Sequence, residues 1–193
     1  MKNILLIAGG GGDEHEISLT SCAFIRSFLV NSSKYRPIQI TIEKDKTWKH
    51  ESGVACELNI EGQLLIFKDE ERRGIDSIVN IDYVIPYMHG YPAETGHIQG
   101  MFSLMNLPYF GSNHETHSNC FNKITTKLWL EKLEIPVTPY VFLTDLEQYS
   151  KAEEFYTIYS QNGVFIKASS QGSSVGCYPV SNINDLKEAL KNA

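Results

Sequence analysis

The N-terminal segment carries the pattern that most constrains the fold. A short apolar run, NILLIA, is followed by four glycines at positions 9–12 and then by DEHEISLTSCAFIRSFLVN. Continuous apolar runs of this kind are typical of strands buried on both faces of a parallel sheet. In the longer segment, apolar residues fall at spacings that can share one face of a helix: Ile17, Phe24, Ile25, Phe28 and Leu29. We therefore expect a strand, a glycine turn and a helix, with Asp13 as the N-cap residue of a capping box.

The alternation of strands and helices continues along the chain. Strands are expected within 36–44, 55–69 (a hairpin turning at Glu61-Gly62), 81–90, 107–112, 140–144 and 164–180, and helices within 97–106, 118–133, 145–161 and 184–193. Alternation over the first part of the chain indicates an α/β fold with a parallel sheet. We expect an N-terminal α/β domain at 1–115 and the beginning of a second, incomplete domain at 116–193.

Composition and charge exclude several classes of protein. The net charge of −6 and the pI near 5.5 argue against a surface for duplex nucleic acid, which requires a basic face. The cysteines are dispersed without a C-x-x-C motif, so we expect reduced thiols. The N-terminal apolar run is too short for a signal peptide, and no stretch reaches the length of a membrane span. A cytoplasmic protein without a nucleic-acid or membrane partner is expected.

Four familiar functional motifs are considered, and none of them is supported by its sequence context. The glycines at 9–12 lack the spacing of a dinucleotide fingerprint and of a Walker A loop. The sequence around Ser174 matches G-x-S-x-G, but strand-forming CYPV follows it and no histidine lies beyond His117, which excludes a nucleophile elbow. His114 and His117 are better interpreted as polar residues before a helix than as a metal pair, because no third ligand is evident.

The segment VFIKASSQGSSVGCYPV, at 164–180, suggests an anion site. Lys167 ends an apolar strand, where a lysine needs a negative partner. The loop after it offers hydroxyls, including those of Ser173 and Ser174, and glycines that let backbone amides converge on an anion. A lysine with such a loop suits a polyphosphate. His89 ends another buried strand at the edge where α/β sheets bind ligands.

Four motifs occur together and in order: GGGGDEHEISLTS, HGYPAETGHIQGMFSLMNLPYFGS, FNKITTKLWLEKLEIPVTPY and VFIKASSQGSSVG. In this combination the chain resembles the D-alanine–D-alanine ligases of the ATP-grasp superfamily. The resemblance implies a Rossmann-like pre-ATP-grasp domain followed by the beginning of an α+β ATP-grasp domain. It also implies an enzyme that uses ATP to phosphorylate the carboxylate of one D-alanine. The amine of a second D-alanine then displaces phosphate and gives a peptidoglycan precursor.

The resemblance also assigns roles to individual residues. Glu14 matches the glutamate that faces the ammonium of the first D-alanine, and His89 matches a histidine beside the substrate. Ser173 matches a flap serine that links to this glutamate, so that Glu14 and Ser173 are the expected catalytic residues. The positions that match the ligands of the ATP phosphates are Lys123, Lys167, Ser173 and Ser174. Mg²⁺ (or Mn²⁺) would accompany ATP, with ligands expected beyond Ala193 and none within the chain.

Further expectations follow from the resemblance. Because the family's adenine segment and metal ligands lie beyond the flap, the chain as given is expected to be an inactive fragment. Asn122 replaces the family aspartate before Lys123, and Ala168 replaces a proline, which leaves open a ligase of different specificity, such as D-Ala–D-lactate. A non-catalytic N-terminal binding module is the other alternative. Family members are commonly homodimers through the N-terminal domain, and the helix at 97–106 is a candidate face.

Overall fold

The N-terminal apolar run lies inside a four-stranded sheet of the order β3-β2-β1-β7. In the computed structural model, which describes residues 1–193, β1 (Lys2–Gly9) pairs in parallel with β2 (Tyr35–Ile42) and with β7 (Tyr83–Pro86). The short strand β3 (Trp48–His50) is antiparallel to β2. This sheet belongs to the first of two compact units, Met1–Ser118 and Asn119–Ala193. The α/β class with a parallel sheet, expected from the sequence, is confirmed.

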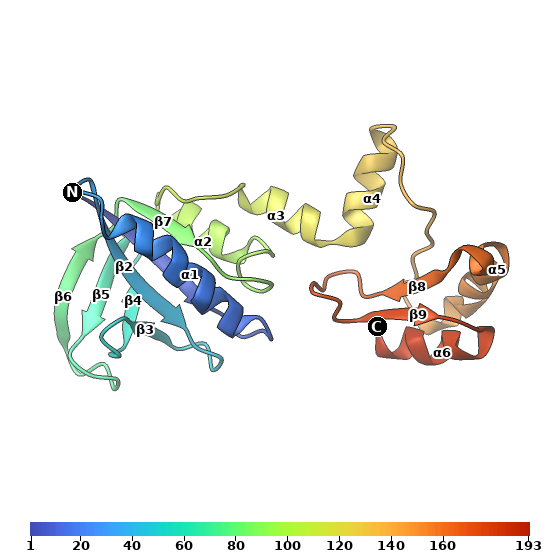
Figure 1. Cartoon of the computed structure of the whole chain (residues 1–193), viewed down its shortest axis with the longest axis horizontal. Coiled ribbons are helices and arrows are strands. Elements are labelled where there is room, and N and C mark those ends of the chain that lie inside the picture. Colours follow the sequence, from blue (N-terminus) through green and yellow to red (C-terminus); the bar gives the residue numbers. More distant parts are fainter. The chain divides into compact units, whose positions relative to one another are not determined.

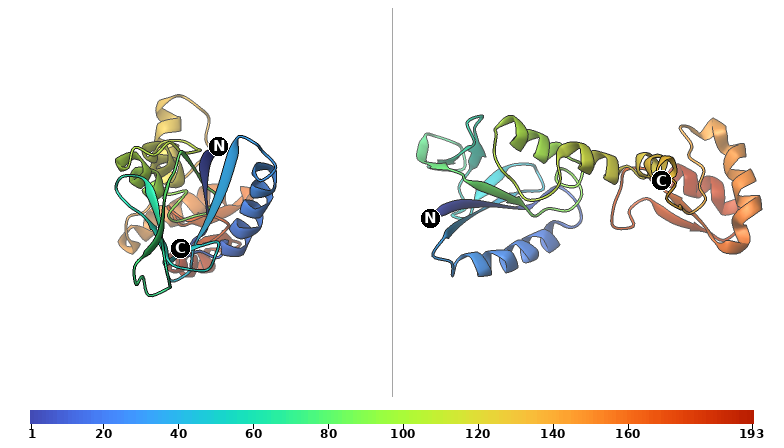
Figure 2. Two further views of the ribbon diagram at one scale, coloured as in Figure 1. Left: turned by 90° about the vertical axis from the view of Figure 1, so that its left-hand side faces the viewer. Right: turned by 90° about the horizontal axis from the view of Figure 1, so that it is seen from above.

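Side chains of β1 alternate between two separate hydrophobic cores, because successive residues of a strand point to opposite faces. Ile4, Leu6 and Ala8 pack with the buried side of α1 (His15–Leu29). Leu5 and Ile7 pack on the other face with α2 (His97–Leu104) and with a second sheet. Figure 2 shows the two helices on opposite sides of β1. Both faces of the strand are therefore covered, as its uninterrupted apolar sequence predicted.

The second sheet is antiparallel, in the order β4-β5-β6. Strands β4 (Cys56–Leu58) and β5 (Gln63–Phe67) form the predicted hairpin, whose turn contains Gly62 with a φ of 75°. Strand β6 (Ile75–Asn80) is not among the expected strands. Its missing signal has a physical cause, since the strand lies at the edge of the sheet and exposes apolar and polar side chains alike.

The second unit is built on one hairpin. Strands β8 (Val164–Lys167) and β9 (Cys177–Val180) pair antiparallel, and α5 (Tyr149–Tyr159) and α6 (Ile183–Asn192) pack on them (Figure 1). Short 3₁₀ turns, η1 (Leu146–Gln148) and η2 (Ser160–Asn162), flank α5. The small core is Ala152, Val164, Val180, Leu186 and Ala189. Helix α3 (His114–Phe121) spans the boundary between the two units and α4 (Lys123–Lys132) belongs to the second, and neither contains a buried residue.

Four expectations about local structure are wrong or incomplete. The helix expected at 118–133 is broken at Asn122, whose extended backbone and side-chain acceptor form the N-cap of α4. The segment 140–144 forms no strand, because no other segment pairs with it. The segment 107–112 contributes only one isolated bridge to β7. Asp13 is not a helix cap, since Glu14 occupies the N-cap position of α1 and makes no side-chain capping bond.

None of the helices combines the length and the apolar character that crossing a membrane requires.

Candidate functional site

The carboxyl ends of β1, β2 and β7 meet at one edge of the first sheet, because the three strands are parallel. Gly9 and Gly10 leave β1 there, and Glu14 begins α1. At Gly9 the backbone has a φ of 88°, and a Cβ would lie 2.3 Å from the carbonyl oxygen of Ile42. Only glycine fits this turn. The glycines therefore place the start of α1, with half-buried Glu14, at the edge where α/β sheets bind ligands.

Ser18 holds this edge together, and sequence reasoning missed it. Its hydroxyl donates to the carbonyl oxygen of Tyr87 at 2.5 Å and accepts from the amide of Gly9 at 2.8 Å. One fully buried side chain thus connects α1, the end of β1 and the segment after β7. A signal existed in the sequence, because Ser18 shares a helical face with Cys22, Ile25 and Leu29, where an apolar residue is the usual choice.

His15 makes a second link at the same edge. Its Nδ1 lies 2.8 Å from the carbonyl oxygen of Gly10, and the side chain is buried. Since a carbonyl only accepts hydrogen bonds, Nδ1 carries the proton in this contact. The first turn of α1 is therefore fixed to the glycine turn by His15 and to the strands by Ser18, which orients Glu14 between them.

His89 follows β7 at the same edge of the first sheet. Its Nδ1 lies 3.9 Å from a carboxylate oxygen of Glu94, and its ring meets that of Tyr87 edge to face. The Nε2 atom of His89 is buried and has no hydrogen-bond partner. A buried polar atom without a partner is unfavourable, and native proteins rarely leave one. Both the location and the unpartnered nitrogen suit a ligand that forms a hydrogen bond to His89.

In the second unit, the loop between β8 and β9 is fixed to the start of α4. The amide of Lys123 donates to the carbonyl oxygen of Ser169 at 2.8 Å, and its ammonium donates to that of Gln171 at 2.5 Å. The amide nitrogen of the Asn122 side chain donates to the hydroxyl of Ser170 at 3.2 Å. These contacts join the predicted phosphate lysine of α4 to the predicted flap.

Two ammonium groups lie near each other at this loop. Partial burial lowers the pKa of Lys123, and the positive charge of Lys167 lowers it further. Neither lysine has a carboxylate oxygen within ion-pair distance. Lys167 is itself exposed and lies 5.9 Å from the ring centre of Phe165. Because Lys167 is exposed, it needs no negative partner, which contradicts the expectation from the sequence. The interpretation of this loop as an anion site therefore rests on the two neighbouring ammonium groups of Lys123 and Lys167.

The two predicted flap serines are exposed at the tip of the loop. Ser173 and Ser174 have φ values of 46° and 66°, in a region that residues other than glycine seldom adopt. Such outliers concentrate at functional sites. Their hydroxyls make no hydrogen bond to another residue, while Val175 and Cys177 use their amides to close the turn. The loop thus presents two free hydroxyls near two uncompensated cations, which suits an oxyanion-rich ligand.

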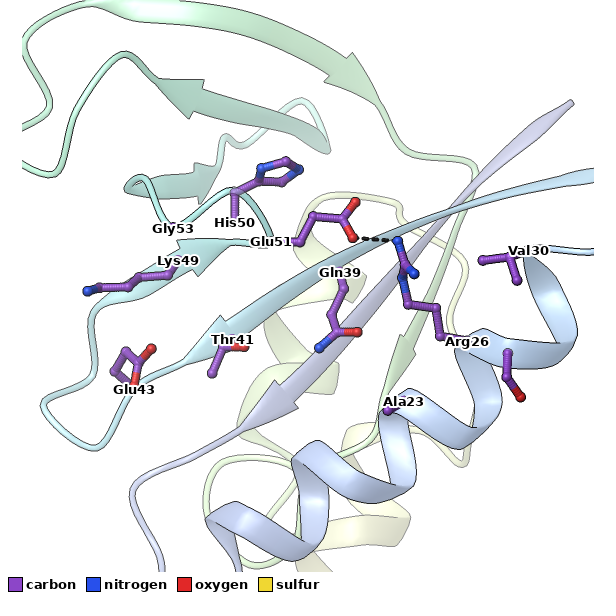
Figure 3. Close-up of a pocket in the computed structure, with 11 residues that line it drawn as sticks. Ala23, Arg26, Val30, Gln39, Thr41, Glu43, Lys49, His50, Glu51 and Gly53 are labelled. Atoms are coloured by element: carbon purple, nitrogen blue, oxygen red, sulfur yellow. Dashed lines mark hydrogen bonds and ion pairs between the residues drawn. The ribbon is translucent and has the colours of Figure 1, made fainter.

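A pocket of about 650 Å³ lies elsewhere in the first unit, between α1 and the strands β2 and β3 (Figure 3). Arg26 and Glu51 form an ion pair of 2.6 Å across it. None of the residues that the sequence assigns to substrate or nucleotide lines this pocket. The chain contains no cluster of three or more His, Cys, Asp or Glu side chains that could hold a metal ion.

Comparison with known proteins agrees with this arrangement. Residues 3–112 match the family described as D-ala D-ala ligase N-terminus, and 129–193 match D-ala D-ala ligase C-terminus. The D-alanine–D-alanine ligase of Shewanella pealeana is 45% identical over 192 residues, which are 100% of this chain and 56% of the relative. The enzyme of Shewanella sediminis is 44% identical, with the same 56% coverage of the relative. The chain therefore spans little more than half the length of these relatives.

Solved structures give the same result. D-alanyl-alanine synthetase A from Vibrio cholerae superposes with a TM-score of 0.90 at 38% identity, over 100% of this chain and 55% of that one. A D-alanine–D-alanine ligase from Aeromonas hydrophila gives 0.84 at 38% identity, over 99% of this chain and 60% of that one. The solved structures that the chain resembles have the ATP-grasp fold, so the chain is part of an ATP-grasp protein.

The chain belongs to the D-alanine–D-alanine ligase family, which consists of ATP-dependent ligases. The resemblance inferred from four sequence motifs is confirmed.

Proposed function

We propose that the protein joins two D-alanine molecules into D-alanyl-D-alanine, a peptidoglycan precursor, at the expense of ATP. ATP supplies the phosphoryl group that converts the carboxylate of the first D-alanine into an acyl phosphate. The observation that carries the proposal is the pair Lys123 and Lys167, which lacks carboxylate partners and lies beside a loop with free hydroxyls. Phosphoryl transfer depends on cations and oriented donors of this kind.

The residues of the second unit would act on the phosphates. The ammonium groups of Lys123 and Lys167 neutralise phosphate oxygens, and the hydroxyls of Ser173 and Ser174 donate to them from the loop. Ser173 also acts as a catalytic residue. Mg²⁺ or Mn²⁺ accompanies ATP, and no residue of this chain is assigned to the metal. The fit of the site to phosphates is supported by its net positive charge and by its unused donors.

The carboxyl edge of the first sheet would receive the amino acid. Glu14 holds the ammonium of the first D-alanine by its negative charge, and His89 donates a hydrogen bond to the carboxylate. The unpartnered Nε2 atom of His89 supports this role. Ser18 and His15 position Glu14 and take no part in the chemistry.

Residues 1–115 form the pre-ATP-grasp domain and 116–193 form the beginning of the ATP-grasp domain. The protein acts in the cytoplasm as a homodimer, with D-alanine and ATP as its small-molecule substrates.

Catalysis is tested on the whole protein by mass spectrometry of the product. D-alanine with ATP should give D-alanyl-D-alanine, whereas L-alanine should give no dipeptide. Formation of D-alanyl-D-lactate in preference to the dipeptide would replace the proposed specificity, and absence of any ATP-dependent product would favour a binding module.

The phosphate site is tested on this chain with inorganic triphosphate as the probe. Isothermal titration should show binding that weakens as salt rises, because the contacts are between charges. The double change Lys123→Ala with Lys167→Ala should abolish it. Lys151→Ala is the matched control, because this lysine is exposed on α5. Equal binding by the double variant and the control would contradict the assigned site.

A further inference from the structure

Helix α2 carries one polar side chain among its buried residues. Gln99 is 2% exposed, whereas its buried neighbours Ile98 and Phe102 are apolar and belong to the core of the first unit. The apolar periodicity of α2 therefore reflects packing within the unit, and the contact face between subunits that was expected on the helix at 97–106 is withdrawn. Packing alone would also favour an apolar residue at position 99, because burial of an amide is unfavourable unless the amide is hydrogen-bonded.

The amide of Gln99 is only partly satisfied. Its Nε2 donates a hydrogen bond to the carbonyl oxygen of Ala93 at 2.8 Å, and its Oε1 is buried without a partner. Buried polar atoms of native proteins are nearly always hydrogen-bonded, and an unused buried acceptor is unfavourable. The feature that distinguishes Gln99 from an apolar residue of the same length is thus its bond to Ala93, and a role for Gln99 has to come from this bond.

The bond holds one peptide unit of the loop between His89 and α2. The peptide between Ala93 and Glu94 is planar, so its carbonyl and its amide keep a fixed relation. Gln99 holds the carbonyl end, and the amide of Glu94 donates to the carbonyl oxygen of Gly90 at 2.7 Å. Because both ends are held, the backbone of Glu94 has a fixed place relative to His89, the residue before Gly90.

Glu94 faces one nitrogen of the His89 ring. Its carboxylate oxygen lies 3.9 Å from Nδ1, and the other ring nitrogen, Nε2, is buried without a partner. A carboxylate beside one nitrogen of an imidazole orients the ring and thereby determines what the other nitrogen offers to a ligand. Gln99 therefore acts on His89 through the peptide that it holds and through the carboxylate of Glu94.

Other contacts hold the rest of this loop. The amide of Ile98 donates to the carbonyl oxygen of Pro92 at 3.3 Å, and the hydroxyl of Ser118 donates to the carbonyl oxygen of Thr95 at 3.0 Å. These bonds act on the residues on either side of the peptide that Gln99 holds. Loss of the Gln99 amide should therefore release this one peptide and leave the remainder of the loop in place.

We propose that Gln99 is a positioning residue of the amino-acid site. Its amide holds Glu94 beside Nδ1 of His89 and so directs Nε2 toward the carboxylate of the first D-alanine. The inference rests on the proposed function, in which His89 binds this carboxylate. Gln99 does not contact the substrate itself, because it is fully buried. Ser18 orients the group that receives the ammonium, and Gln99 orients the group that receives the carboxylate.

Hydrogen exchange of this chain tests the contact without substrate. Gln99→Met keeps the length of the side chain and removes the amide. It should speed exchange at the amide of Glu94 at least ~10-fold by freeing this peptide locally, while the amides of β1 exchange at the wild-type rate. Ser103→Ala is the matched control on α2, because Ser103 is exposed and its hydroxyl donates only to the main-chain carbonyl oxygen of Gln99. Exchange at Glu94 should be unchanged in this control.

The ring signals of His89 give a second readout on the same chain. At constant pH, Glu94→Gln should shift the proton–carbon NMR signals of the His89 ring, and Gln99→Met should shift them in the same direction. The double variant should shift them no further than Glu94→Gln alone, because Gln99 acts through that carboxylate. Unchanged His89 signals in Gln99→Met, additive shifts in the double variant, or equal acceleration of the Glu94 and β1 amides would each overturn the inference.

Steady-state kinetics of the whole protein test the consequence for the reaction. Gln99→Met and Glu94→Gln should each raise the KM for the first D-alanine about 10-fold at unchanged kcat, because both weaken binding that the ground state and the transition state share. A fall in kcat at unchanged KM would contradict the positioning role. Failure of the wild-type protein to form dipeptide would refute the proposed function, whereas the NMR measurements decide without substrate whether Gln99 positions His89.

Discussion

Replacement of Ser18 by alanine should destabilise the first unit far more than the loss of one oxygen atom suggests. The hydroxyl satisfies two backbone groups at once, the amide of Gly9 and the carbonyl of Tyr87, and its surroundings exclude water. Ser18→Ala leaves both groups unpaired in the interior. An unsatisfied buried group costs about 1–3 kcal/mol. The better helix propensity of alanine returns only about 0.5 kcal/mol. For two such groups, less the gain in helix propensity, we expect the free energy of unfolding to fall by roughly 1.5–5.5 kcal/mol.

Urea denaturation monitored by tryptophan fluorescence measures this loss. The chain has two tryptophans, Trp48 beside the core of the first unit and Trp129 on α4. A Trp129→Phe background leaves Trp48 as the reporter of the first unit, and Trp129 is exposed enough to tolerate the change. Ser27→Ala is the matched control in the same helix, because the hydroxyl of Ser27 is exposed and donates only to Phe24.

The control should change the free energy of unfolding by less than about 0.5 kcal/mol. If Ser18→Ala and Ser27→Ala destabilise equally, the two hydrogen bonds of Ser18 do not hold the carboxyl edge together. The positioning of Glu14 would then need another explanation.

Three further outcomes are expected. Gly9→Ala should prevent normal folding of the first unit, since the added carbon meets a carbonyl oxygen at 2.3 Å, whereas Gly12→Ala, with nothing within 4 Å, should be tolerated in the same urea titration. Asn122→Ala should cost about 1 kcal/mol through loss of the N-cap of α4 and lower the helical circular dichroism; an unchanged spectrum would contradict the cap. Burial raises the pKa of Cys22 from 9.0 to about 11, so this thiol stays protonated at pH 8 in the native protein. Exposed Cys120 should therefore react with a thiol reagent long before Cys22, and the free energy of unfolding should fall as pH rises from about 9 toward 11, because only the unfolded thiol ionises in that range.

The sequence predicted those elements whose apolar pattern is decided locally. The run at β1 and the periodicity of α1 determined a strand, a turn and a helix, and the structure contains them. The apolar segment at 140–144 was misleading because a strand exists only where another strand pairs with it, and pairing is not visible in a single segment. The break at Asn122 depends on its side-chain oxygen, which accepts a hydrogen bond from the amide of Thr125. This local contact outweighs the helical periodicity around it.

The residues of the candidate site likewise divide into those with a local sequence signal and those that depend on contacts distant in sequence. His89 was found because it lies directly after a recognisable strand, whereas Glu14 was assigned only through the family resemblance. The structure brings both to the carboxyl edge. Ser18 was missed because its importance comes from two backbone groups distant in sequence. The exposure of Lys167 was also unpredictable, since alternation along β8 indicates which residues share a face but does not indicate which face is covered.

The hydrogen bond between the amide of Lys123 and the carbonyl oxygen of Ser169 has a mechanical consequence. It ties the first turn of α4 to the base of the loop through main-chain atoms, so among replacements of Lys123 only proline, which lacks the amide hydrogen, removes it. A ligand that displaces the loop with Ser173 and Ser174 should therefore also displace the start of α4, so that the loop and the helix move together.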